Sequence, residues 1–203
     1  MFLHEIMKGA DPSHLAFTGE VDVTYGALED AIHRYRNAIY ALGVREGERV
    51  SLYSANRAEF VYAFMAVVSL GAIIVPVNNS LVDREVDYIL KDSGSTLLIT
   101  DTPMDVSVPS ISIEELDEKS HEPLHEAPDF PASLTEDDIC ALIYTSGTTG
   151  SPKGAMLTHK NLVRNVEQFT ARIIFKPEDK VLCVLTMFHC YGMTTIVHGS
   201  LYA

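Results

Sequence analysis

From residue 49 to residue 100, short apolar segments alternate with longer segments whose apolar residues recur at helical spacing. Short apolar runs indicate buried strands, and the longer segments indicate helices. Strands that alternate with helices form βαβ units around a parallel sheet, and short connections place the helices on its faces. The predicted fold class is therefore α/β, with a largely parallel sheet flanked by helices. The strands are expected at residues 49–54, 72–77 and 96–100, and the helices at residues 57–70 and 83–91.

The residues before this alternation are expected to form a hairpin and a helix. Two strand candidates surround the turn pair Gly19-Glu20. A helix is expected to begin at Thr24 or Tyr25 and to be closed by Gly43. The two strands cover residues 15–18 and 21–25, and the apolar positions of the helix are Leu28, Ile32, Tyr35 and Ile39.

The longest apolar run, residues 61–77, lies at the lower limit of length for a membrane span. Gly71 and Pro76 divide the run, so a buried helix followed by a strand explains it without a membrane. The first five residues lack a basic region followed by an apolar core, so no signal peptide is expected. We therefore expect a chain without a transmembrane segment and with a cytoplasmic location.

The net charge of the chain disfavours some classes of binding partner, and its cysteines disfavour disulfides and a zinc site. The chain has 15 basic and 28 acidic residues, a net charge of −13, and no cluster of Lys or Arg. Nucleic acids and anionic membranes are therefore disfavoured as partners. Cys140, Cys183 and Cys190 are odd in number and lack C-x-x-C spacing, which indicates reduced, buried thiols rather than disulfides or a zinc site.

Residues 114–138 differ from the rest of the chain, because ten of these 25 residues are acidic and three are prolines. We predict an acidic surface connection here. Within it, residues 121–125 match the zinc motif H-E-x-x-H letter for letter. That motif needs both histidines on one helical face, and Pro123 in its middle disfavours a helix. A solvated connection is favoured over the alternative, a zinc protease.

The stretch YTSGTTGSPKG, residues 144–154, follows an apolar run that is expected to be a buried strand ending at Thr145. Glycines allow a close backbone approach to a ligand, hydroxyls donate to phosphate oxygens, and Lys153 supplies one positive charge. The spacing fits neither the Walker loop nor the dinucleotide fingerprint, and Pro152 disfavours a helix at Lys153. The sequence predicts a strand–loop–strand phosphate grip, and the alternative is a flexible linker.

After this loop, Thr158 is expected to cap a helix that runs to about residue 172, and residues 181–185 to form a buried strand. His159 at the helix start is expected to have a packing or capping role. His189 follows the second apolar segment, at a place where ligand-facing residues tend to lie, but taken alone it is expected to be a core or surface residue.

These residues carry a resemblance to a known family. Residues 144–154, continued by AMLTH at 155–159, resemble the signature loop of the adenylate-forming enzymes: acyl- and aryl-CoA synthetases, peptide-synthetase adenylation domains and luciferases. The block MFHCYGM at 187–193 resembles the family's downstream substrate segment. Further upstream segments are also typical of the family, namely TYGAL at 24–28, ANRAEF at 55–60, GAIIVPVN at 71–78 and YILKDS at 88–93.

The resemblance implies that residues 1–203 are the amino-terminal part of the large domain of such an enzyme, without the carboxy-terminal lid domain. It implies ATP-dependent activation of a carboxylic acid, fatty or aryl, to an acyl-adenylate, followed by thioester formation with coenzyme A. Mg²⁺ would be the metal cofactor. The chain alone is expected to be inactive, and an apolar surface at its end is expected to cause self-association.

The resemblance also implies roles for individual residues. Lys153 would offset phosphate charge as the catalytic residue, Thr145 would assist the metal, and His189 and Tyr191 would border the acid. The residues expected to hold the nucleotide phosphates are Thr145, Ser146, Gly147, Thr148, Thr149, Gly150 and Lys153. The alternatives are a peptide-synthetase-type adenylation domain, or a protein that binds phosphate or nucleotide without catalysis. An unrelated Walker-type nucleotidase is disfavoured by the Pro152-Lys153-Gly154 context.

Overall fold

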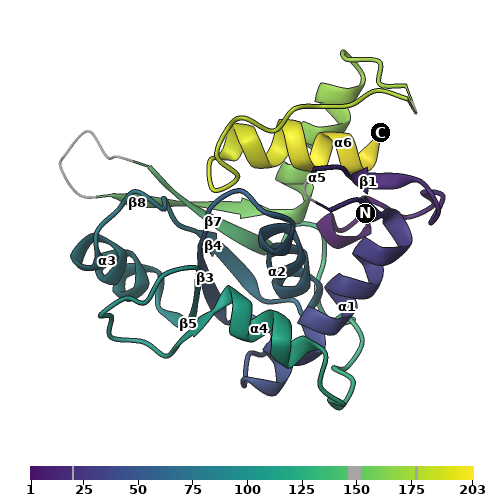
Figure 1. Cartoon of the computed structure of the whole chain (residues 1–203). Helices are drawn as coiled ribbons and strands as arrows, with labels where there is room; N and C mark the ends of the chain where they lie inside the picture. The colour runs from purple at the N-terminus through teal and green to yellow at the C-terminus, as the bar shows by residue number, and fades with distance from the viewer. Residues whose placement is uncertain (20, 146–151, 177) are drawn as a thin grey trace.

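The computed structural model describes residues 1–19, 21–145, 152–176 and 178–203. Within these residues a six-stranded sheet has the order β6-β5-β3-β4-β7-β8 and forms the centre of the fold (Figure 1). All neighbouring pairs are parallel except β7 and β8, which are antiparallel. The strands are β3 (Arg49–Tyr53), β4 (Ile73–Pro76), β5 (Ser95–Thr100), β6 (Ser110–Ser112), β7 (Ile139–Thr145) and β8 (Lys153–Thr158). The predicted α/β class and largely parallel sheet are confirmed.

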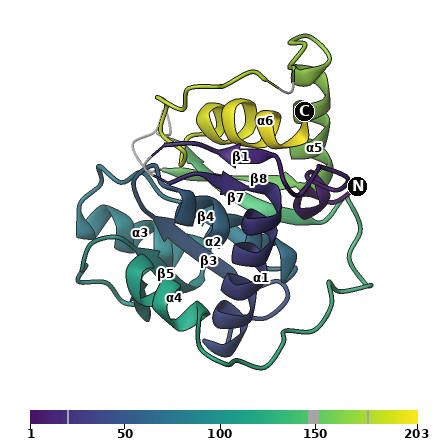
Figure 2. The same ribbon diagram turned by 45° about the vertical axis from the view of Figure 1, so that its right-hand side comes forward.

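Helices cover both faces of this sheet, as the turned view shows (Figure 2). On one face, α3 packs on a cluster that contains Val75 and Leu98. On the other face lie α1, α2 and α4, over a larger cluster that contains Ile74 and Ile99. Successive strand residues thus point to opposite faces. The helices on these faces are α1 (Tyr25–Ala41), α2 (Ala58–Ser69), α3 (Asp83–Ser93) and α4 (Ile113–Ser120).

The termini form the remaining part of the fold. A short 3₁₀ helix, η1 (Leu3–Glu5), is followed by the antiparallel pair β1 (Leu15–Phe17) and β2 (Val23–Thr24), which confirms the predicted hairpin. Glu20 of its predicted turn lies outside the described residues. After the sheet come α5 (His159–Thr170), a π-helix η2 (Gly192–His198) and α6 (Gly199–Tyr202). The Thr158 side chain accepts from Asn161 N at 3.1 Å, so the predicted cap of α5 is confirmed.

The boundaries of the elements from residue 25 to residue 100 agree with prediction within about two residues. Thr24 caps α1 by accepting from Ala27 N at 3.2 Å. Gly43 and Gly71 have φ of 99° and 72°, the left-handed conformation that ends helices. The run 61–77 is divided into α2 and β4, as expected, and no helix in the described residues is long and apolar enough to cross a membrane.

The prediction of a surface connection over residues 114–138 is wrong for its first part. Residues 113–120 form α4, preceded by the unpredicted strand β6. Ile113 and Leu116, three residues apart, are fully buried, and Ser112 caps the helix by accepting from Glu115 N at 3.0 Å. The acidic composition concealed this narrow apolar stripe. The H-E-x-x-H letters at 121–125 follow the end of α4 and are not helical, as Pro123 predicts.

The buried strand predicted for residues 181–185 is also wrong. The segment has no regular structure, and Leu182 and Val184 are 79% and 72% exposed. An apolar, β-branched sequence becomes a strand only where a pleated surface is available to pair with it, and none of the described strands pairs with this segment. The three cysteines are free, but only Cys140 is buried; Cys183 is partly exposed and Cys190 exposed, which corrects the expectation of buried thiols.

Candidate functional site

The segment that was predicted to grip phosphate lies at the end of the β7–β8 hairpin. In its register Thr145 lies opposite Lys153, and Tyr144 lies opposite Gly154, so the hydroxyl and the cation face each other at the end of the ladder. Both Thr145 and Lys153 are exposed. The strand before the loop and the strand after it are confirmed. Residues 146–151 between them lie outside the described residues. They include Ser146, Gly147, Thr148, Thr149 and Gly150, which were predicted to hold phosphate.

Tyr144 fixes the hairpin to α3. A Cβ added to Gly154 would lie 3.1 Å from Tyr144 Cε2, so glycine leaves the space that the tyrosine ring occupies. The Tyr144 hydroxyl donates to Asp92 Oδ2 at 2.6 Å, and the Tyr88 hydroxyl donates to Pro152 O at 3.4 Å. Burial, together with the Asp92 carboxylate, raises the pKa of Tyr144, so its hydroxyl keeps the proton that it donates. Helix α3 therefore contacts β7 and Pro152, the residue just before β8.

The second predicted segment, around His189, is a tight turn that leads into η2. His189 N donates to Thr186 O at 3.1 Å, Tyr191 N donates to His189 Nδ1 at 3.2 Å, and Met193 N donates to His189 O at 3.0 Å. A Cβ on Gly192 would lie only 2.4 Å from Thr186 O. Glycine at this position is thus a steric requirement of the turn. His189 is exposed, and Tyr191 is 56% exposed.

Topology places both segments at one edge of the sheet. Strands β3, β4 and β7 are neighbours and parallel, so the loops after Tyr53 and after Thr145 leave from the same, carboxyl edge. The loop after β3 holds the segment before His189, because Asn56 bonds to Leu185 O and Met187 N. Two strand spacings separate β3 from β7, which is about 10 Å. Ligands bind at this edge in open α/β sheets.

Sequence analysis did not assign roles to several residues that hold these two segments. Asp92 and Asn56 lie in stretches that it considered typical of the family, but nothing in their spacing indicated their contacts. Asp101 was also missed: its Oδ2 accepts from Ala55 N at 2.7 Å and thereby joins the loops after β3 and β5. These contacts connect residues 46 to 131 positions apart, so only the folded chain reveals them.

The described residues contain no group of three His, Cys, Asp or Glu that could hold a metal ion. Protein sites usually bind Mg²⁺ through one or two protein ligands together with the phosphate oxygens of the substrate. A hydroxyl beside the phosphates of a nucleotide is therefore a suitable oxygen ligand for Mg²⁺. Thr145, exposed at the end of β7 and opposite Lys153, fits that donor set.

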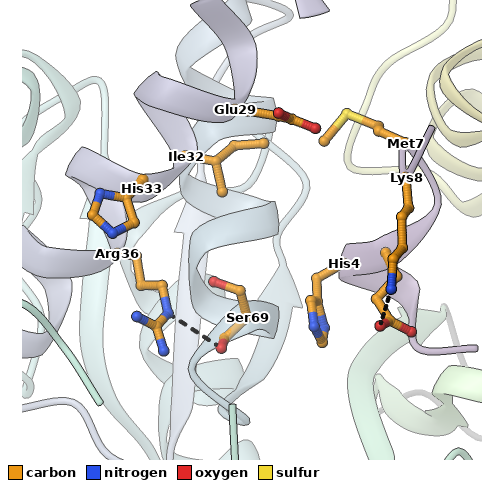
Figure 3. A pocket seen from close by; sticks show the side chains of 9 residues that line it. His4, Met7, Lys8, Glu29, Ile32, His33, Arg36 and Ser69 are labelled. Carbon is orange, nitrogen blue, oxygen red and sulfur yellow. Dashed lines mark hydrogen bonds and ion pairs between the residues drawn. The ribbon is translucent and has the colours of Figure 1, made fainter. Parts of the chain in front are cut away.

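A cavity of about 380 Å³ lies elsewhere, between η1 and the helices α1 and α2 (Figure 3). Its lining includes His4, Lys8 and Arg36 but none of the predicted site residues. The Arg36 guanidinium is already used: it donates to Ser69 O, Ala127 O and Pro128 O. Arg36 thus anchors the connection after α4 to the body of the fold.

Comparison with known proteins agrees with the family resemblance. The profile of the family described as AMP-binding enzyme matches residues 7–203, so the chain belongs to that family. Feruloyl-CoA synthase from Amycolatopsis sp. is 35% identical over an alignment of 183 positions, which covers 86% of this chain and 36% of that protein. Long-chain-fatty-acid–CoA ligase FadD13 from Mycobacterium tuberculosis (strain ATCC 25618 / H37Rv) is 31% identical over an alignment of 194 positions, which covers 90% of this chain and 39% of that protein. The chain therefore spans little more than a third of these curated relatives.

Solved structures share the fold. O-succinylbenzoate coenzyme A synthetase from Bacillus subtilis, in complex with AMP, superimposes with a TM-score of 0.87 at 30% identity, over 98% of this chain and 53% of that chain. The N-terminal domain of FACL13 from Mycobacterium tuberculosis, bound to an inhibitor, also has a TM-score of 0.87 at 30% identity, over 99% of this chain and 55% of that chain.

Proposed function

We propose that this chain carries two parts of the active site of an AMP-forming acid–thiol ligase. These are the hairpin that binds the phosphates of ATP, formed by β7 and β8, and part of the segment that binds the carboxylic acid, around His189 and Tyr191. The observation that supports this most directly is the register pair of Thr145 and Lys153 at the carboxyl edge of the sheet, in a chain that belongs to the AMP-binding enzyme family. The relatives' names point to carboxylic acids, fatty or aryl, as substrates and to coenzyme A as the acceptor thiol.

In the proposed reaction the substrate carboxylate attacks the α-phosphorus of ATP, and the bond to pyrophosphate breaks. The acid itself is the nucleophile, so the protein needs to position two anions and to offset charge on the leaving group. Lys153 supplies that positive charge, and the amides and hydroxyls of residues 145–150 hold the phosphates. His189 and Tyr191 border the acid. A coenzyme A thiol then attacks the acyl-adenylate and releases AMP.

Bound Mg²⁺ would supply further neutralisation of phosphate charge. Thr145 is the proposed protein ligand, because its hydroxyl lies beside the proposed phosphate position, opposite Lys153. The proposal also places residues 1–203 in the amino-terminal part of the family's large domain, since they match the N-terminal domain of FACL13. We also propose that the protein is cytoplasmic and that this chain self-associates through exposed apolar residues.

Acid-dependent release of pyrophosphate from ATP tests the proposed function. The complete gene product should release pyrophosphate with a fatty or an aryl acid and then form a thioester with coenzyme A. The 203-residue chain alone should not turn over, because it covers only 36% of feruloyl-CoA synthase. Transfer to a carrier-protein thiol but not to coenzyme A would favour the peptide-synthetase alternative. Nucleotide binding without acid-dependent pyrophosphate release would favour the non-catalytic alternative.

A further inference from the structure

Asn56 makes the most direct connection between the sheet and the segment that carries His189. Its Oδ1 accepts from Met187 N at 2.8 Å, and its Nδ2 donates to Leu185 O at 2.8 Å. The side-chain amide thus bonds to two backbone groups of one segment at once, as a neighbouring strand would. Of the small side chains, only asparagine carries an N–H donor and a carbonyl acceptor on two separate atoms.

The position of Asn56 is itself fixed by the sheet. Ala55 N donates to Asp101 Oδ2 at 2.7 Å, and Asp101 N donates to Tyr53 O at 3.2 Å. The loop after β3 is therefore bonded to the end of β5, which pairs with β3 in the sheet. Asn56 thus lies on a loop that two neighbouring strands hold in place. A polar contact made from a rigid element positions its partner better than one made from a free loop.

Downstream of the two hydrogen bonds of Asn56, the chain reaches His189 within two residues of Met187. The Met187 side chain is buried, Thr186 O accepts from His189 N at 3.1 Å, and Gly192 packs directly beneath Thr186 O. Fixing residues 185–187 therefore also fixes the turn of His189. Upstream, Leu182 and Val184 are 79% and 72% exposed, so the segment has little apolar packing of its own there.

We propose that Asn56 is a positioning residue for the acid-binding segment: through Leu185 and Met187 it sets where His189 and Tyr191 stand relative to the phosphate hairpin. This inference rests on the proposed function. Asn56 is exposed, so its hydrogen bonds determine the position of a surface segment rather than the stability of the core.

The test compares Asn56→Ala with Asn165→Ala, a matched change of an exposed asparagine on α5. In the complete gene product, Asn56→Ala should raise the KM for the acid in pyrophosphate release roughly ten- to hundredfold, the effect of losing two hydrogen bonds. The KM for ATP should change by less than about twofold. The urea midpoint of unfolding should stay the same within error. Asn165→Ala should change none of these.

Hydrogen exchange provides a second readout that does not need turnover. In the 203-residue chain, Asn56→Ala should speed amide exchange in residues 185–191 and leave exchange in β7 unchanged. Unchanged exchange in this segment would overturn the proposal, as would an unchanged KM for the acid or an equal rise in both KM values. Absence of acid-dependent pyrophosphate release by the unmodified protein would instead refute the proposed function, and with it any role of Asn56 in acid binding.

Discussion

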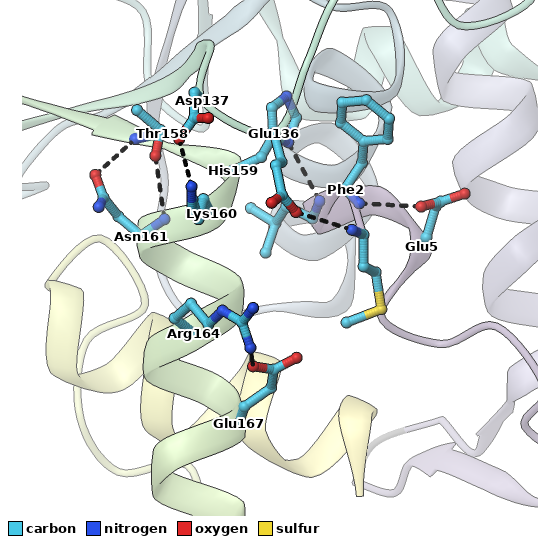
Figure 4. A network of polar contacts seen from close by, with 12 residues as sticks. Phe2, Glu5, Glu136, Asp137, Thr158, His159, Lys160, Asn161, Arg164 and Glu167 are labelled. Atoms are coloured by element: carbon cyan, nitrogen blue, oxygen red, sulfur yellow. Dashed lines mark hydrogen bonds and ion pairs between the residues drawn. The ribbon is translucent and has the colours of Figure 1, made fainter.

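At the scale of single residues, His159 shows how the amino terminus is attached to the start of α5. It is 2% exposed, and its Nδ1 accepts a hydrogen bond from Leu3 N at 3.2 Å (Figure 4). Burial, and then the neighbouring His4, lowers the pKa of His159 to about 4. The other charged groups near the ring are Asp138, Glu5 and the terminal amine. A neutral imidazole is therefore part of the contact.

Acid should weaken this contact in a defined pH range. The unfolded chain binds a proton at His159 near pH 6.5 and the folded chain near pH 4, so stability is lost as pH falls between these values. From pH 7.5 to pH 5.0 this one residue should cost about 2 kcal/mol. His159→Leu should be less stable at pH 7.5 but should lose about 2 kcal/mol less on acidification, measured by urea unfolding at both pH values. The exposed His33→Ala should retain the full loss, and an equal loss in His159→Leu would contradict this account.

Some residue-scale features follow from the sequence and others do not. Local signals predicted Thr158 as a cap and His159 as a packing residue, because a cap and its helix are adjacent in the chain. The sequence also predicted the strand ending at Thr145 and the absence of a helix at Lys153. The partners of Asn56 and Asp92 could not be predicted, since they lie 52 to 131 residues away. The roles of Lys153, His189 and Tyr191 remain predictions.

At the scale of elements, α4 shows where pattern reasoning failed. Ten acidic residues in the segment 114–138 dominate its composition, yet two buried positions, Ile113 and Leu116, suffice to fix a helix against the fold. Tyr35 of α1 donates to Asp117 at 3.0 Å and adds a polar contact between the two helices. The opposite error occurred at residues 181–185, where an apolar pattern was interpreted as a strand although no described strand pairs with it.

Substitution of Leu116 tests whether α4 belongs to the core. Leu116→Ala should lower the free energy of unfolding by about 2 to 5 kcal/mol, because it removes a fully buried side chain and leaves a cavity. Glu118→Ala, an exposed position on the same helix, should change it by less than about 0.5 kcal/mol. Urea unfolding measures both. Similar small effects in the two variants would mean that residues 113–120 are a surface connection after all.

At the scale of the whole molecule, the described surface carries a run of exposed apolar side chains near the carboxy-terminal part of the chain. Ile174 is 85% exposed, and Leu182 and Val184 are nearly as exposed. Exposed apolar groups in one region favour association between copies. The apolar surface was predicted at the end of the chain, where Met193, Val197 and Leu201 are instead buried. The exposed apolar residues lie at 174–184, and self-association remains a prediction.

The double variant Leu182→Ser/Val184→Ser should reduce self-association of the 203-residue chain. Sedimentation at rising concentration should show larger species for the unmodified chain and mainly monomer for the variant, with weaker binding of a hydrophobic dye. Val82→Ser, which removes another exposed apolar side chain at the start of α3, serves as the control. A chain that stays monomeric at high concentration without the substitutions would refute this prediction.

The proposed activity also belongs to the whole molecule, because it would require the proposed phosphate hairpin and the proposed acid-binding segment together. Lys153 is the sole cation in the stretch 144–154, and pyrophosphate leaves only in the first half-reaction. A charge-assisted contact to phosphate contributes about 1.5 to 3 kcal/mol, roughly a factor of ten to a hundred in rate if it acts mainly in the transition state.

The most direct test measures the two half-reactions of Lys153→Ala separately in the complete gene product. Pyrophosphate release from ATP and acid should slow by about ten- to a hundredfold, while thioester formation from a supplied acyl-adenylate should change by less than about threefold. Lys160→Ala, which removes a lysine paired with Asp137 on the surface, should affect neither rate. Equal loss in both half-reactions, or loss in neither, would contradict the assignment of this hairpin as the pyrophosphate grip.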